Sequence, residues 1–166
     1  MTGGDRVFWA FIALLVLLNF VLQVGLGLGG AAPDLLTVAV LLGARRLRGV
    51  GAAALGLGLG VLRDALALVG FGASAVALTV TGYLGARSRD LFVGDTTIFV
   101  AVYVFLGKWF HDLLYRAAES AVAGGGMVAR KGAAAQLLVD APLAALYAAG
   151  AAVLVVLVYQ AVTGRR

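Results

Sequence analysis

The sequence contains no cysteine, and only 13% of its 166 residues are charged. The missing cysteine excludes a disulfide framework, a thiol nucleophile and a cysteine-ligated metal. The scarcity of charge is equally informative, because a typical soluble domain is about 25% charged and about 45–50% apolar. Here 63% of the residues are hydrophobic. A soluble fold of this length has too little interior to hide so much apolar surface, so the composition predicts an integral membrane protein.

The hydrophobic residues are gathered in six segments, which predict an all-α membrane protein. We expect a single domain over residues 1–166, built as a bundle of about six transmembrane helices. The expected segments cover residues 7–28, 33–44, 50–69, 71–86, 91–115 and 133–162. The second is short for a bilayer core of about 30 Å at about 1.5 Å per residue, so it either is re-entrant or spans a thinned bilayer. Asp34 suits the positive N-terminal end of this helix.

The basic residues predict how the segments are oriented, since arginine and lysine gather on the cytoplasmic side of a membrane. If all six segments cross, the inside holds the topology-setting arginines Arg45, Arg46, Arg48, Arg87 and Arg89. A re-entrant second segment would move the first three outside and largely remove the asymmetry. The pattern therefore favours six crossings with both termini cytoplasmic. We assign the net charge of +5 to topology and to anionic lipid of the bilayer, not to nucleic acid.

Small residues form a stripe along the third segment. Ala52, Gly56 and Gly60 follow one another at four-residue spacing, and Asp64 continues the same stripe. Small residues at this spacing let two helix backbones approach closely within a membrane. The stripe predicts either packing inside this protein or docking of a partner's helix.

Ionisable residues inside the apolar segments form a second pattern, which we expect to be an intramembrane polar cluster. In the predicted topology all of them lie in the outer third of the bilayer, and Lys108 and Asp112 are four apart on one helix face. The set is Asp34, Arg63, Asp64, Lys108, Asp112 and Asp140. Charges at this depth must pair or face a polar cavity. A structural ion network, a polar pocket for a small ligand and a proton or ion path all remain open.

Catalytic motifs are missing from the sequence: it has no Walker-type P-loop, no HExxH and no GxSxG. His111 is the single histidine and cannot build a histidine-rich metal site; we expect it at the membrane interface. Tyr103, Trp109 and Tyr115 are expected to anchor the fifth segment there. We therefore predict no enzyme activity, no cofactor and no metal. A small enzyme of lipid metabolism is the third-ranked function, because no site for it is recognisable.

The order of features in residues 33–87 is distinctive. Pro33 and Asp34 open a short apolar helix that ends in the basic run 45–48. The glycine-striped stretch 51–60 then leads into Arg63 and Asp64, and a glycine-containing turn at 70–72 leads to a helix ending in Gly-Tyr-Leu at 82–84. In this order the features resemble the MreD family of rod shape-determining proteins, over about a third of the chain.

The resemblance implies a non-catalytic membrane scaffold of the bacterial cell-elongation machinery, located in the cytoplasmic (inner) membrane. Such a scaffold associates with MreC, and through it with the MreB filament, RodA and its transpeptidase. Residues 117–132, the one sizeable outer loop, would be available to a periplasmic partner. The family is also thought to resemble the substrate-binding subunits (S components) of energy-coupling-factor vitamin transporters. The alternative function is therefore such a subunit, with the polar cluster lining an outward-opening cavity.

Overall fold

A computed structural model describes residues 3–27, 32–66, 72–89, 97–122 and 140–163, and within these ranges the chain is helical without strands. The helix α1 (Gly3–Phe20) continues into a π-helical turn, η1 (Val21–Gly25). The other helices are α2 (Leu35–Ala44), α3 (Gly49–Leu66), α4 (Ala73–Ser88), α5 (Thr97–Val122) and α7 (Ala141–Thr163). The expected all-α class is confirmed.

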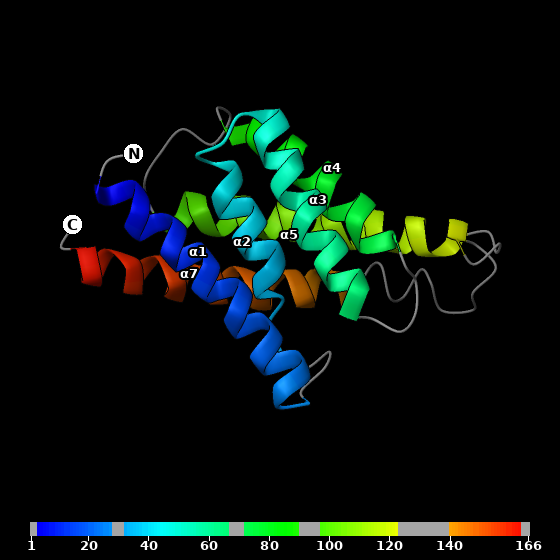
Figure 1. Ribbon diagram of the computed structural model, residues 1–166, viewed down its shortest axis with the longest axis horizontal. Helices are drawn as coiled ribbons and strands as arrows, with labels where there is room; N and C mark the ends of the chain where they lie inside the picture. Colours follow the sequence, from blue (N-terminus) through cyan, green and yellow to red (C-terminus); the bar gives the residue numbers. More distant parts are fainter. Residues whose placement is uncertain (1–2, 28–31, 67–71, 90–96, 123–139, 164–166) are drawn as a thin grey trace.

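Four helical stretches are long and apolar enough to cross a membrane. They are Asp5–Gln23, Gly49–Leu66, Thr97–Ala121 and Ala141–Val162. The helices α2 and α4, with 10 and 16 residues, are shorter. Every residue of α2 is buried, because the helix lies among its neighbours in the centre of the bundle (Figure 1). A helix enclosed on all sides needs an apolar surface all round, which explains why α2 carries no polar face.

The helix boundaries depart from the expected segments at several points. The helix α5 continues to Val122, past the expected end at residue 115. The helix α4 begins at Ala73 after Gly72, whose φ of 97° is a left-handed conformation that glycine adopts without strain. Residues 133–139 of the sixth expected segment and 91–96 of the fifth lie outside the described residues.

The start of α1 and the end of α7 lie at the same end of the bundle (Figure 1). There the Phe8 ring of α1 packs edge-on against the Tyr159 ring of α7, with centroids 6.1 Å apart. The Arg89 guanidinium donates to the carbonyl of Leu47 at 3.1 Å, which joins the end of α4 to the turn after α2. We call this the arginine end, because Arg45, Arg46, Arg48, Arg87 and Arg89 all lie on these last turns and loops.

The small-residue stripe of α3 is buried against α4. The buried residues of α3 are the four that the spacing selects: Ala52, Gly56, Gly60 and Asp64. A Cβ atom on Gly56 would lie 2.1 Å from the carbonyl oxygen of Leu78, and one on Gly60 would lie 2.5 Å from the Cα of Ala75. The stripe therefore packs inside this protein, and α4 already occupies the face that a partner's helix would need.

Tyr103 does not anchor the bundle at the membrane interface as expected. Its side chain is buried, and its hydroxyl donates to the carbonyl of Leu41 at 3.1 Å. Leu41 is in the last turn of α2, where carbonyls have no partner within the helix, so the phenol supplies a donor that the helix lacks. Trp109, by contrast, is exposed on α5, which agrees with contact to lipid.

Substitution of glycine on α3 tests the close approach to α4. Gly56→Ala should destabilise the protein by about 1–3 kcal/mol, because the added methyl group meets backbone that cannot move aside. Gly58→Ala is the matched control: its Cβ would have no neighbour within 4 Å, and alanine favours helix by up to about 1 kcal/mol. The measurement is the melting temperature of each detergent-solubilised variant. Equal melting temperatures for the two variants would contradict this packing.

Candidate functional site

Asp34 begins the central helix and binds the backbone of its first turn. It is the N-cap of α2, and its Oδ1 accepts the N–H of Thr37 at 3.2 Å while its Oδ2 accepts the Thr37 hydroxyl at 2.9 Å. Asn19 of α1 adds a further acceptor, since its Oδ1 receives the N–H of Leu36 at 3.3 Å. The backbone N–H groups of the first turn have no acceptor within the helix, and here they donate to buried side-chain oxygens. The expected place of Asp34 at the positive end of this helix is confirmed.

The Asp34 carboxylate also forms ion pairs with two cations from other helices. Arg63 of α3 places Nη1 3.2 Å from Asp34 Oδ2, and Lys108 of α5 places Nζ 3.1 Å from the same oxygen. Lys108 also pairs with Asp112, one turn further along α5. We call these four residues the Asp34 cluster. With two carboxylates and two cations, the cluster has no formal net charge, and it joins α2, α3 and α5.

The cluster is largely closed to its surroundings. The side chains of Lys108 and Asp34 are 8% and 10% exposed. Arg63 is the most exposed member, at 27%, and its guanidinium lies 5.8 Å from the centroid of the Tyr115 ring. Removing charge from water is costly unless each charge is paired and hydrogen-bonded, and here each is. Cluster residues do not line the cavities described at the arginine end or between α4 and α5. Of the three interpretations that the sequence left open, this geometry agrees best with a structural ion network.

Asp64 follows Arg63 in the chain but serves a different purpose. Its carboxylate is buried and accepts three backbone N–H groups at the start of α4: Gly72 at 2.9 Å, Ser74 at 3.2 Å and Ala75 at 3.0 Å. The residue at the N-cap of α4 is Gly72, which has no side chain to cap with. A carboxylate from a neighbouring helix replaces it, and its charge suits the positive end of the helix dipole.

Asp140 is not brought to the cluster. It lies exposed just before α7, and within the described residues it forms no ion pair. Asp140 was predicted to join the other acids only because of its expected depth in the membrane, in a helix expected to begin at residue 133. Depth along a helix does not decide which way a side chain faces.

His111 lies in the interior and not at the membrane interface, so that expectation is wrong. It is 1% exposed, it contacts the backbone of Ala77 in α4, and its Nδ1 has no hydrogen-bond partner among the described residues. No group of three or more His, Asp or Glu side chains within the described ranges is placed to hold a metal ion.

Thr37 and Asn19 are polar members of this region that sequence reasoning missed. Thr37 stands three residues after Asp34, which is the spacing of an N-cap and the residue whose backbone N–H donates to it. Asn19 is the one amide in the apolar stretch 7–22, and a buried polar side chain there had to find a partner. Both signals were available, but neither says which helix provides the partner.

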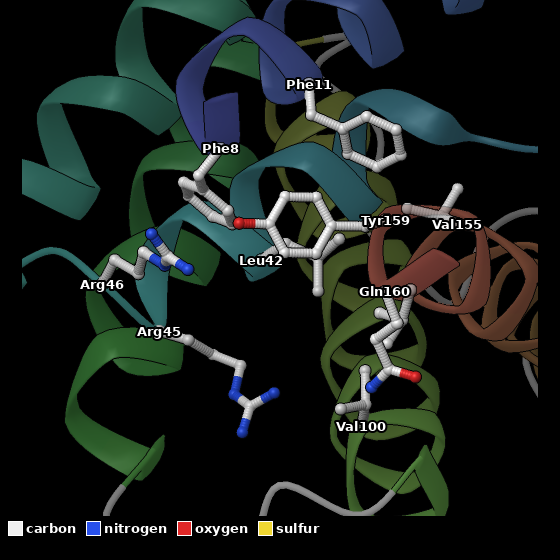
Figure 2. Close-up of a pocket in the computed structure, with 10 residues that line it drawn as sticks. Phe8, Phe11, Leu42, Arg45, Arg46, Val100, Val155, Tyr159 and Gln160 are labelled. Atoms are coloured by element: carbon white, nitrogen blue, oxygen red, sulfur yellow. The ribbon is translucent and has the colours of Figure 1, made fainter. Parts of the chain in front are cut away.

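A separate cavity of about 530 Å³ lies at the arginine end, between α1, α2, α5 and α7. Figure 2 shows Arg45 and Arg46 on one side of it, Gln160 of α7 on the other, and the rings of Phe8, Phe11 and Tyr159 beside them. Of the five topology-setting arginines, Arg45 and Arg46 line this cavity, whereas Arg48, Arg87 and Arg89 line another at the same end.

No family model, curated protein or solved structure matches the chain.

The capping of α4 by Asp64 gives a residue-level prediction. Asp64→Ala should speed amide hydrogen exchange at Gly72, Ser74 and Ala75 and lower the melting temperature, because bonds to a charged acceptor contribute about 1.5–3 kcal/mol each. Asp64→Asn keeps one acceptor oxygen and should be intermediate. Asp140→Ala is the control, since Asp140 is exposed, and should leave these amides unchanged. If these three amides exchange in Asp64→Ala at the wild-type rate, the carboxylate does not cap α4.

Proposed function

We propose that this chain is a non-catalytic membrane scaffold of the machinery that elongates rod-shaped bacteria, located in the cytoplasmic membrane and acting with MreC. In this proposal the six helices cross the membrane with both termini in the cytoplasm, so that the arginine end faces the cytoplasm. RodA, its transpeptidase and the MreB filament are reached through MreC. The starting point is the order of features in residues 33–87, which resembles the MreD family.

One observation carries the choice between a scaffold and a substrate-binding subunit: the charges of the Asp34 cluster are paired with one another. Asp34, which a transporter subunit would turn toward its ligand, already binds Thr37, Arg63 and Lys108. A ligand would have to displace these partners, and each displaced charge would be left buried and unpaired. The geometry therefore favours a cluster that holds helices together.

The surface that remains for contacts consists of apolar helix faces. The N-terminal helix and α7 expose many large hydrophobic side chains. They are Val7, Leu14, Leu17 and Leu18 on α1, Val21 on the following turn η1, and Leu143, Leu146, Leu154, Leu157, Val158 and Val162 on α7. Faces of this kind fit lipid or the membrane helix of a bitopic partner such as MreC, because packing within a bilayer uses shape more than polarity. Residues 123–132 of the loop expected to meet a periplasmic partner lie outside the described residues.

The test is affinity purification of the tagged chain from gently solubilised native membranes, with mass spectrometry of both proteins and small molecules. We expect MreC to be recovered together with RodA and its transpeptidase. A tagged membrane protein of similar size, expressed at the same level, controls for proteins that adhere to any helical bundle. Recovery of an ATPase pair with a bound vitamin, and of no wall-synthesis proteins, would replace the scaffold by the transporter subunit.

A further inference from the structure

The cavity at the arginine end is built from two kinds of surface. Its polar side holds the guanidinium groups of Arg45 and Arg46 and the carboxamide of Gln160. Its remaining walls are apolar and come from four helices, with Phe8, Phe11, Leu42, Val100, Val155 and Val156 as the lining side chains. A volume of about 530 Å³ is within the range of about 300–1,000 Å³ that small-molecule sites occupy. Figure 2 shows the polar groups facing the same space as the aromatic rings.

The charge around this cavity is positive. None of the described residues that line it carries a carboxylate, and the Oδ1 atom of Asp5 in α1 lies 3.6 Å from Arg46 Nη1. That distance is longer than a hydrogen bond, so the pair is a loose one between two partly exposed groups. The Arg46 guanidinium also stacks over the Phe8 ring, with Cζ 3.8 Å from the ring centroid. This stacking fixes the position of the guanidinium without engaging the N–H donors, which lie in the guanidinium plane.

The depth of the cavity in the membrane follows from the helices that form it. Phe8 is near the start of the candidate span Asp5–Gln23, and Gln160 is near the end of the candidate span Ala141–Val162. In helices that cross a bilayer, these positions correspond to the boundary between headgroups and acyl chains on either side of the membrane. Exposed Val7, Leu157 and Val158 continue the apolar surface outside it.

We infer that this cavity binds the phosphate headgroup of an anionic phospholipid, with the first part of its acyl chains against the apolar walls. Guanidinium groups hold phosphate oxygens through paired N–H donors, and basic pockets between membrane helices suit anionic headgroups. A free phosphate would bind the arginines but would make no contact with the apolar walls formed by Phe11, Val155 and Val156. The inference stands on the cavity alone and does not depend on the scaffold function.

The test is native mass spectrometry of the purified full chain in detergent with equimolar phosphatidylglycerol and phosphatidylcholine of the same acyl chains. We expect one phosphatidylglycerol to be retained in preference to phosphatidylcholine. The double variant Arg45→Gln, Arg46→Gln should lose about tenfold or more in that preference, because each charged hydrogen bond contributes about a factor of ten. Arg6→Gln removes one charge from an exposed site near the same end that lines none of the described cavities, and should behave as wild type.

A second variant keeps the test decisive if the double variant does not fold. Val156→Trp should fill the cavity without changing charge and should abolish the retained lipid while the melting temperature stays near that of wild type. Equal retention of the two lipids by wild type, or an unchanged preference in both variants, would overturn the inference. Displacement of the lipid by soluble glycerol phosphate at equal concentration would also overturn it, since the site would then be one for a free anion.

Discussion

The carboxylate of Asp34 is the point on which the arrangement of α2, α3 and α5 depends. It caps the central helix through Thr37, and it pairs with a cation from each of the other two helices, while Asp112 supplies the second negative charge of the cluster. Neither Lys108 nor Arg63 can be left in an apolar interior without an anion, so their helices are held where Asp34 is. The position of Asp34 is itself fixed, because it is the N-cap of a helix whose every residue is buried.

The two contacts of α4 depend on different chemistry. Along its length it meets α3 through Gly56, Gly60 and Gly82, where any side chain beyond hydrogen would strike backbone. At its start it is capped by Asp64, which ends the same stripe on α3. Close approach and capping are thus linked, since only helices whose backbones nearly touch bring the Asp64 carboxylate within reach of three amides of the next helix.

The composition, the helix positions and the buried face of α3 could all be predicted from the sequence, because each is a local pattern of apolar, small or charged residues. The pairing of Lys108 with Asp112 was predictable for the same reason, as both are on one helix face. What the sequence did not reveal is which helix a polar side chain meets. Asp64 was grouped with the ion cluster and instead caps α4, Asp140 was placed in the cluster and is exposed, and His111 and Tyr103 were expected at the membrane interface and are buried. Each of these outcomes is set by contacts between segments distant in sequence, which no local pattern records.

The most direct test of the account is a double-mutant cycle on Asp34 and Arg63, measured as free energies of unfolding in mixed micelles. Asp34→Asn, Arg63→Gln and the double variant isolate the energy that the two side chains share. We predict a coupling of about 1 kcal/mol or more, as found for residues in one buried ionic network. Effects of the two substitutions that simply add would mean that the pair does not hold α2 to α3, and the central role given to Asp34 would be wrong.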